Sequence, residues 1–299
     1  MNQYLSALKQ VLNEGTVKED RTGVGTISLF GMQQRYDLSK TFPAVTTKRL
    51  AWKACVGELL WMIEGSGDER RLAEITHGTA DGNVTIWTPN ALAPYWKPKA
   101  KFEGDLGRVY GVQWRHWRQY REQKDMGPAH LGGTRVATDR HEVDQLLNLI
   151  EGIKQDPHGR RHILSAWNPG ELEAMALPPC HVLAQFYVSK DNRLSCQMYQ
   201  RSCDMFLGVP FNIASYSLLT ALIAQVCDLD VGEFVHVLGD AHIYLNHVEQ
   251  VNEQLNREPL PAPQLWLNPD IKDITKFTMA DIRLDGYTSH GAIKAEMAV

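Results

Sequence analysis

Hydrophobic residues in the first half of the chain recur mainly at the spacing of amphipathic helices. Leu5, Leu8 and Leu12 share one helical face, and Gly15 follows as a stop signal. Stretches rich in Pro, Gly, Lys and Arg interrupt this pattern and indicate excursions at the surface. The pattern predicts helices over residues 4–14, 52–64 and 142–155, a strand over residues 26–30, and excursions over residues 88–107 and 118–140.

Beyond residue 160 the pattern becomes mainly that of strands. One long segment, residues 214–227, is apolar nearly all round, so we expect a central helix covered by other elements. Strands are predicted over residues 162–167, 181–188, 194–200 and 234–238. Because strands and helices do not alternate regularly, we predict an α+β fold with a single domain over residues 1–299.

The composition is that of an ordinary globular protein, with 43% hydrophobic and 22% charged residues. The formal net charge of −4 provides no general basic field for DNA, so any phosphate must be bound by a local arginine cluster. No apolar run approaches the roughly 20 residues that span a bilayer, and the first residues lack the pattern of a signal peptide. We therefore expect neither DNA nor a membrane as a partner.

The five cysteines favour a reducing environment. Their number is odd and no CxxC pair occurs, which argues against a disulfide framework or a zinc knuckle. The pairs His158/His162 and His242/His247 lack a third ligand at suitable spacing, so we predict no metal. A cytoplasmic location is the simplest expectation.

Cys180 stands in a Leu-Pro-Pro-Cys-His segment directly before a predicted strand. The two prolines fix the backbone and hold the thiol in a defined place, as a cysteine nucleophile requires. The alternative is a small buried core cysteine, which is the usual state of this residue type. The remaining cysteines lack this context and are predicted to lie in or near the core: Cys55, Cys196, Cys203 and Cys227.

Arginines are the candidates for binding an anion. Arg160 and Arg161 are adjacent at the start of a predicted strand, so their side chains can serve different surfaces or different subunits. Arg201 follows another predicted strand with Ser202 beside it, and Arg21 lies in an Asp-Arg-Thr-Gly segment. The planar guanidinium suits phosphate. The alternative for each arginine is a solvated surface charge.

Three further polar positions each allow two interpretations. The amide of Asn212 suits either the N3–H and O4 edge of uracil or the capping of the apolar helix that follows it. Glu58 has apolar helical neighbours, so its carboxyl is either desolvated with a raised pKa, as proton transfer requires, or directed to solvent. His242 and Tyr244 form either a site for a sugar hydroxyl or an interior hydrogen-bonded pair.

Taken together, these stretches resemble the thymidylate synthase family from about residue 4 to residue 299. The most specific matches are the run QRSCDMFLGVPFNIASY at residues 200–216 and the PPCH segment at residues 178–181. Further matching segments are residues 19–23, 42–48, 58–61, 86–87, 110–115, 160–161, 239–247 and 297–299.

The resemblance implies a twisted mixed β-sheet packed with helices around a long buried central helix. It implies a homodimer in which Arg160 and Arg161 reach the partner's site. It also implies an activity: Cys180 adds to C6 of dUMP, and C5 accepts one carbon from 5,10-methylenetetrahydrofolate, giving dTMP and dihydrofolate. No metal is implied.

By match to the family, each residue of the site receives an expected role. The expected catalytic residues are Cys180, Glu58, Asn212, Tyr110, Arg201 and Asp204. The expected nucleotide-binding residues are Arg21, Arg160, Arg161, Gln200, Arg201, Ser202, Asn212, His242 and Tyr244. The expected folate-binding residues are Lys48, Ile86, Trp87, Asp204, Leu207, Gly208, Phe211 and Ala298, with Val299 closing over the site.

The alternative product is 5-hydroxymethyl-dUMP, made by a dUMP hydroxymethylase that lets water attack the methylene intermediate. Residues 42–55 look like phage versions of the family. The chain also departs from the usual family pattern on the folate side. Thr88 stands where an aspartate is usual, Arg108 where a proline is usual, and Gly291 where a proline commonly follows the histidine.

Two classes outside this family use some of the same residues. A cytosine-5 methyltransferase also has a Pro-Cys nucleophile, but it needs a glycine-rich cofactor loop and a basic DNA face, and neither is evident. A non-catalytic nucleotide-binding or RNA-binding protein would keep the arginines without needing Cys180 and Glu58 together.

Overall fold

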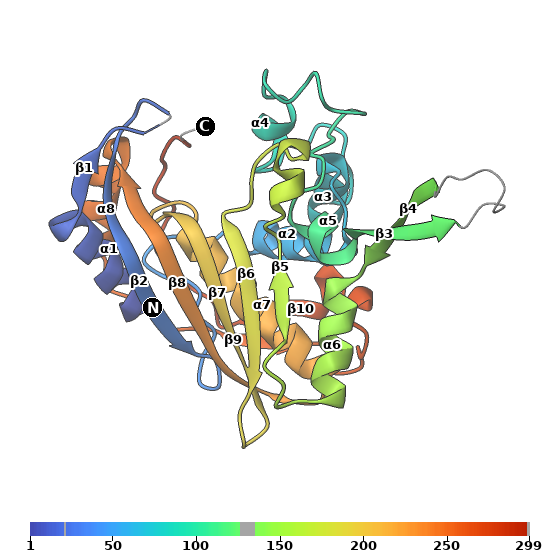
Figure 1. Cartoon of the computed structure of the whole chain (residues 1–299). Helices are drawn as coiled ribbons and strands as arrows, with labels where there is room; N and C mark the ends of the chain where they lie inside the picture. The colour runs from blue at the N-terminus through green and yellow to red at the C-terminus, as the bar shows by residue number, and fades with distance from the viewer. Residues whose placement is uncertain (21, 126–134, 298–299) are drawn as a thin grey trace.

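A six-stranded mixed sheet in the order β1-β2-β8-β7-β6-β5 forms the centre of the molecule (Figure 1). The computed structural model describes residues 1–20, 22–125 and 135–297, without the side chains of residues 121–140. Strands β7 and β8 run parallel, and the other neighbours in this sheet run antiparallel. The sheet strands are β1 (Thr16–Lys18), β2 (Thr26–Asp37), β5 (Ile163–Ser165), β6 (His181–Val188), β7 (Arg193–Asp204) and β8 (Asp230–Tyr244).

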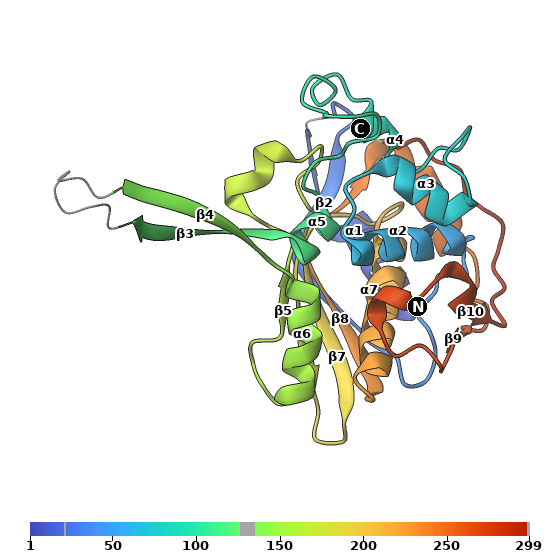
Figure 2. The same ribbon diagram turned by 90° about the vertical axis from the view of Figure 1, so that its right-hand side faces the viewer.

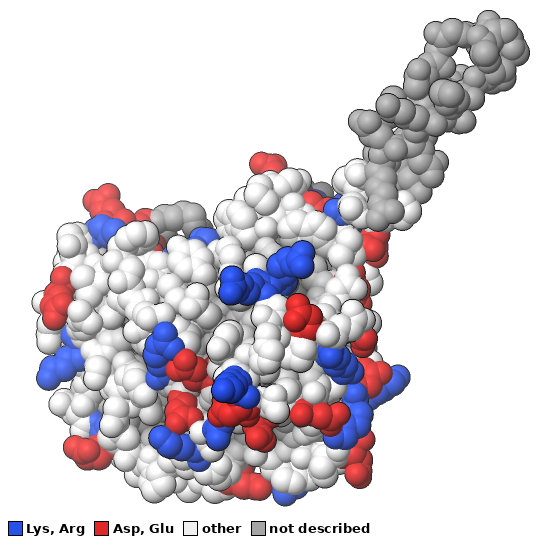
Figure 3. Space-filling model, turned by 60° about the horizontal axis from the view of Figure 1, so that its bottom comes forward, with Lys and Arg blue, Asp and Glu red and all other residues white. Residues whose placement is uncertain are grey.

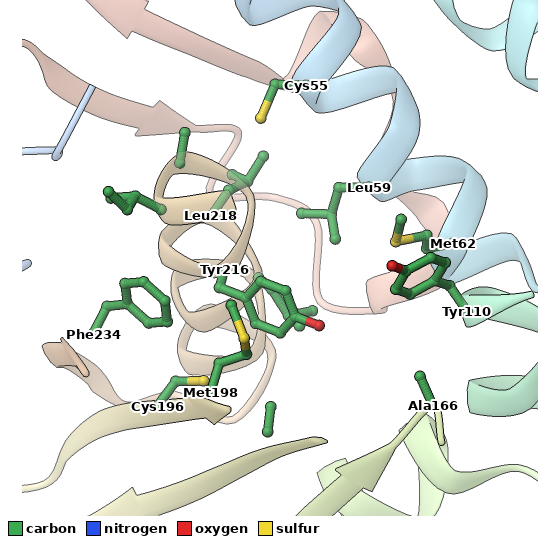
Figure 4. Packing of buried hydrophobic residues seen from close by; sticks show 14 of the residues in the cluster. Cys55, Leu59, Met62, Tyr110, Ala166, Cys196, Met198, Tyr216, Leu218 and Phe234 are labelled. Atoms are coloured by element: carbon green, nitrogen blue, oxygen red, sulfur yellow. The ribbon is translucent and has the colours of Figure 1, made fainter. Parts of the chain in front are cut away.

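The central helix α7 (Val209–Val226) connects the two parallel strands. A parallel pair needs such a crossover, since a tight turn cannot return the chain to the same end of the sheet. Side chains of α7 pack between helix α2 (Trp52–Glu64) and the inner face of the sheet, as Tyr216 and Leu218 illustrate (Figure 4). Although α7 is long and apolar enough to cross a membrane, 83% of that apolar window is buried inside the protein.

The remaining elements cover the edges and ends of the sheet. Figure 2 shows α6 beside β5, and the β3–β4 hairpin extending away from the body. The other helices are α1 (Asn2–Glu14), α3 (Glu69–His77), α4 (Thr88–Ala91), α5 (Tyr110–Arg115), α6 (Gln145–Gln155) and α8 (Val248–Leu255). The short helices and remaining strands are η2 (Pro169–Ala174), η3 (Leu245–His247), η4 (Ile274–Lys276), η5 (Met279–Asp281), β3 (Trp117–Asp125), β4 (Arg135–Val143), β9 (Gln264–Leu267) and β10 (Ile282–Asp285).

The structure confirms the predicted α+β fold, with a mixed sheet around a long buried helix. The surface residues shown in Figure 3 carry both signs of charge intermixed over the lower part of that face, without a field of one sign. This distribution agrees with the small formal net charge of −4.

Several predicted boundaries were wrong for identifiable reasons. The surface excursion predicted over residues 118–140 does extend from the body, but the prediction gave it no strands, and its described part forms β3 and β4. The two strands pair antiparallel, and their sequence carries no apolar period of two that would have predicted them. The central helix begins at Val209, earlier than predicted, because Pro210 is well suited to a first helical turn. Strand β5 is also shorter than predicted and ends at Ser165.

Candidate active site

Cys180 lies at a bend directly before β6, in a position fixed by two neighbouring side chains. The guanidinium of Arg201 donates hydrogen bonds to the carbonyl oxygens of Pro179 and Pro178, both at 2.9 Å. The backbone N–H of Arg201 donates to the carbonyl of Cys180 at 2.9 Å, and the N–H of Cys180 donates to the hydroxyl of Tyr110 at 2.7 Å. The thiol is therefore held on a rigid corner, as the prolines predicted.

The surroundings of the Cys180 thiol shift its pKa in opposite directions. Burial raises its pKa above the ordinary value of a cysteine, while the charge of Arg201 and hydrogen bonds from Tyr110 and Ser202 lower it. The net shift is upward. The resting group is therefore a thiol, and a cation and two hydroxyls lie close enough to stabilise the thiolate when it forms.

Tyr110 is the first residue of α5 and connects the thiol to the apolar wall of the site. Its φ of +23° is unusual for a residue with a side chain, and such strain persists only where the surroundings fix it. Its ring centroid lies 5.8 Å from that of Trp87 and 5.0 Å from that of His181. Tyr110 is thus placed by packing on both sides while its hydroxyl contacts Cys180.

Asn212 lies in the first turn of α7, and Gly208 is the cap of that helix. The interpretation of Asn212 as a helix cap is therefore wrong. Its Oδ1 accepts a hydrogen bond from Nε2 of Gln200 at 2.9 Å, and its Nδ2 lies 2.7 Å from Nε2 of His181. Burial lowers the pKa of His181 to about 4, so this ring is neutral and accepts from the amide.

Glu58 and Trp87, which the sequence analysis placed in separate roles, form one unit. The indole Nε1 of Trp87 donates to Oε1 of Glu58 at 2.6 Å. Burial raises the pKa of Glu58, and the bond from Trp87 partly opposes this effect. The predicted upward shift is thereby confirmed, and the alternative of a carboxyl directed to solvent is not supported. A raised carboxyl pKa favours a role in proton transfer.

His242 and Tyr244 lie two residues apart on β8, as predicted, with ring centroids 5.2 Å apart. The Nδ1 of His242 lies 3.1 Å from the carbonyl of Asp240 and 3.4 Å from its carboxylate. The loop at Asp20 and Thr22 is closed by hydrogen bonds from Thr22 to the Asp20 carboxylate. Arg21, expected to bind phosphate, lies outside the described residues.

The expected folate side is built on the turn between β7 and α7. The Asp204 carboxylate accepts hydrogen bonds from the backbone N–H groups of Phe206 and Leu207, both at 3.0 Å. Gly208, Leu207 and Phe211 follow and are half-buried, whereas Ile86 is 58% exposed on the loop before α4. Ala298 and Val299 lie outside the described residues.

Lys48 is buried, although it was expected to meet the glutamate tail of a folate. Its ammonium donates to the carbonyl of Phe206 and lies 3.6 Å from the centroid of that ring. Burial lowers the pKa of Lys48 to about 8, and the charge of Asp204 opposes this shift. The ammonium therefore lies buried against Phe206, in the turn that precedes α7.

Arg160 and Arg161 are both exposed, in the loop before β5. Within the described part of the chain, their backbone carbonyls accept hydrogen bonds while neither guanidinium forms an ion pair. The structure of one chain thus gathers Arg201 at the thiol and leaves these two arginines at the surface.

The departures from the family pattern have local structural explanations. The N–H of Arg108 donates to the carbonyl of Ala174 at 2.8 Å, a bond that a proline cannot make. Its guanidinium pairs with Glu171 at 2.6 Å, where both side chains are only 11% exposed.

Thr88, the second departure, donates its hydroxyl to the buried carboxylate of Glu69 at 2.5 Å. At the third, the carbonyl of Gly291 accepts a bond from Arg257 at 2.7 Å. Each departure is therefore tied into the fold by hydrogen bonds.

Sequence reasoning missed two histidines of the site. His181 bonds Asn212, and the fully buried His236 lies with Nε2 2.8 Å from Oε1 of Gln200. The available signals were the position of His181 directly after Cys180 and a histidine within the apolar strand pattern around residue 236.

A positioned thiol beside an arginine, a buried amide network and a desolvated carboxyl define a site equipped for nucleophilic and proton-transfer chemistry. A family model described as thymidylate synthase matches residues 2–299. The chain belongs to the thymidylate synthase family.

Two curated relatives give the likeness in more detail. The chain is 50% identical over 300 residues to a bifunctional dihydrofolate reductase-thymidylate synthase of Zea mays. This match covers 99% of this chain and 54% of the maize protein. It is 49% identical over 300 residues to a putative bifunctional dihydrofolate reductase-thymidylate synthase of Oryza sativa subsp. japonica, with 99% and 57% covered. The chain thus spans about half the length of the curated relatives it matches.

Proposed function

We propose that this chain transfers one carbon from 5,10-methylenetetrahydrofolate to C5 of dUMP and releases dTMP and dihydrofolate. One observation carries the proposal: the Cys180 thiol lies against Arg201, Ser202 and Tyr110 on a fixed corner of the backbone. A nucleophile that attacks C6 of a pyrimidine needs this combination of a fixed position and nearby positive charge.

The proposed reaction passes through a covalent adduct between Cys180 and the pyrimidine. Cys180 adds to C6, and its proton is lost as the sulfur bonds carbon. The electron pair of the C5–C6 double bond then makes C5 nucleophilic, and C5 attacks the one-carbon unit of the folate. Loss of the C5 proton and of the folate amine leaves an exocyclic methylene. Hydride from the folate reduces this methylene to methyl, and the sulfur leaves C6.

The other polar groups have matching roles. Asn212 supplies an acceptor and a donor for N3–H and O4 of uracil. The high pKa of Glu58 suits it to moving protons at the base, with Trp87 holding the carboxyl. The arginines would bind the phosphate, and the turn after Asp204 would contact the folate. An apolar, closed site is needed because water would capture the methylene.

The synthase reaction is preferred over the hydroxymethylase reaction. Both relatives are named as synthases, and the three departures on the folate side are accounted for by hydrogen bonds within the fold. Water attack on the methylene therefore has no support from those positions.

The test is to incubate the protein with dUMP and 5,10-methylenetetrahydrofolate, weigh the nucleotide by mass spectrometry and follow dihydrofolate by absorbance. Methyl product with dihydrofolate is expected, and Cys180→Ala should abolish it. Cys227→Ala is the matched control, because this half-buried cysteine caps the far end of α7. A hydroxymethyl product with tetrahydrofolate would replace this proposal by the hydroxymethylase reaction. The absence of both products would refute both reactions.

We further propose that the chain acts as a homodimer with Arg160 and Arg161 supplied across the interface. Their exposed guanidinium groups are free of ion pairs within the described residues, so they are available to a partner. Exposed apolar side chains on nearby strands, such as Ile163 (46%) and Tyr187 (63%), support a contact there.

Mixing two inactive variants tests this arrangement. A heterodimer of a Cys180→Ala chain and an Arg161→Ala chain would contain one complete site if the arginine acts across the interface. Recovered activity on mixing is expected, whereas no recovery despite heterodimer formation would place Arg161 in the site of its own chain.

A single catalytic domain in a reducing cytoplasm completes the proposal. One cluster of buried residues runs from Tyr4 in α1 to Ile282 in β10, and all five cysteines are free thiols. Both observations fit an enzyme of this kind.

A further inference from the structure

Three buried polar side chains and the half-buried Asn212 form a line of hydrogen bonds beneath the expected pyrimidine edge. His236 contacts Gln200 at 2.8 Å, Gln200 contacts Asn212 at 2.9 Å, and Asn212 contacts His181 at 2.7 Å. Only the role of Asn212 at the base follows from the mechanism above. The line reaches from that amide to His236, which is 0% exposed in the centre of β8.

An asparagine amide alone cannot distinguish uracil from cytosine. Its oxygen and nitrogen ends are nearly identical in shape, so a rotation of the amide exchanges donor and acceptor. Uracil offers N3–H and O4, whereas cytosine offers the reverse pattern of N3 and an amino group. Selectivity for uracil therefore requires that Asn212 be prevented from rotating.

Gln200 is the residue that can prevent this rotation. Its Nε2 donates one hydrogen to Oδ1 of Asn212 and the other to the backbone carbonyl of Ser202 at 3.0 Å. A backbone carbonyl only accepts hydrogen bonds, so the nitrogen end of Gln200 must face Ser202 and Asn212. Gln200 is 2% exposed, and we therefore assign it a supporting place behind Asn212.

The oxygen end of Gln200 then depends on His236. A buried amide oxygen without a donor costs about 1–3 kcal/mol, so His236 must donate from Nε2. Burial lowers the pKa of His236 to about 3, which keeps the ring neutral with a single N–H. Its Nδ1 has no hydrogen-bond partner among the described residues, so the tautomer follows from the contact of Nε2 with Gln200.

We propose that His236 is a positioning residue for pyrimidine selectivity: by donating to Gln200 it fixes the amide of Asn212 in the orientation that accepts uracil and rejects cytosine. This inference rests on the proposed function, because it concerns the same nucleotide site. The direction of donation runs from His236 through Gln200 and Asn212 to His181. It requires the Nε2–H tautomer at His236 and the Nδ1–H tautomer at His181, whose buried Nδ1 also has no hydrogen-bond partner among the described residues.

The first experiment compares two variants by calorimetric binding of dUMP and dCMP without folate. His236→Phe keeps a ring of similar shape and removes the donor, so Gln200 and Asn212 become free to rotate. His236→Gln keeps a donor at similar reach and is the matched control. The ratio of the dCMP and dUMP dissociation constants should fall about tenfold or more in His236→Phe and stay within about twofold of the parent in His236→Gln.

A purely structural role for His236 would lower stability in both variants and leave that ratio unchanged, and this result would overturn the inference. A parent protein that binds dUMP selectively while His236→Phe remains equally selective would also overturn it, with the proposed function intact. A parent that shows no preference for dUMP would instead refute the proposed function itself.

The second experiment needs no folded Phe variant. Nitrogen NMR of the ¹⁵N-histidine-labelled parent distinguishes the two neutral tautomers, and the signal missing from His236→Gln assigns the residue. His236 should hold its proton on Nε2 throughout the range in which the protein is folded. A proton on Nδ1 would reverse the direction of the line and overturn the inference.

Discussion

Replacing Trp87 by Phe removes one hydrogen bond from the Glu58 carboxyl while keeping an aromatic ring against Trp61 and Tyr110. The lost bond is short, at 2.6 Å, and its acceptor is a desolvated carboxyl. A hydrogen bond to a charged group contributes about 1.5–3 kcal/mol. The bond favours the ionised form of Glu58, so its removal should raise the Glu58 pKa further.

The pH dependence follows from this sign. The folded-state pKa of Glu58 already lies above its ordinary value, so its contribution to stability is most favourable at low pH and declines as pH rises through that pKa. The additional loss of unfolding free energy in Trp87→Phe should be small near pH 4. This loss should approach about 1.5–3 kcal/mol only where the Glu58 carboxyl is ionised in both the folded and the unfolded state.

Two measurements test this reasoning. Urea unfolding at several pH values should show a difference between variant and parent that grows with pH, and the acidic limb of the kcat profile should move to higher pH. Trp61→Phe is the control, because its indole donates to the neutral carbonyl of Asp68 at 2.9 Å and its loss should be independent of pH. A Trp87→Phe penalty of equal size at pH 4 and pH 8 would refute the assignment.

Three further predictions concern the arginines and the lysine. The lysine of Arg201→Lys cannot hold the carbonyls of both Pro178 and Pro179. The pH midpoint for alkylation of Cys180 by iodoacetamide should therefore move to higher pH. An unchanged midpoint would contradict the role of the guanidinium. Arg108→Ala should lower the free energy of unfolding by about 2–4 kcal/mol in urea without changing the product mass, because Glu171 loses its closest partner. The pKa of Lys48 is about 8, so the KM for folate should rise above pH 8, and Lys48→Met should remove that rise.

The chemistry of the site was largely readable from local sequence. The Pro-Pro-Cys segment predicted a fixed thiol because proline restricts the backbone wherever it occurs. The apolar neighbours of Glu58 predicted its raised pKa, since helical spacing alone places them around the carboxyl. The nearly continuous apolar run predicted α7 because only a covered helix can be apolar on all sides.

Contacts between distant segments could not be read in this way. Trp87 meets Glu58 across 29 positions, and His236 meets Gln200 across 36, so no periodic pattern brings them together. Likewise, Lys48 contacts Phe206 across 158 positions, where the resemblance suggested a contact with folate. Such pairs depend on which elements become neighbours in the folded chain.

The sequence by itself determined which groups are present and which local geometry each is given: the fixed thiol, the desolvated carboxyl and the central helix. Only the tertiary structure decided the direction of the hydrogen bonds behind Asn212. That direction depends on a backbone carbonyl at Ser202 and a buried ring at His236 meeting one glutamine. Donor and acceptor order is a property of three-dimensional neighbours, because an amide side chain offers both ends equally until its surroundings select one.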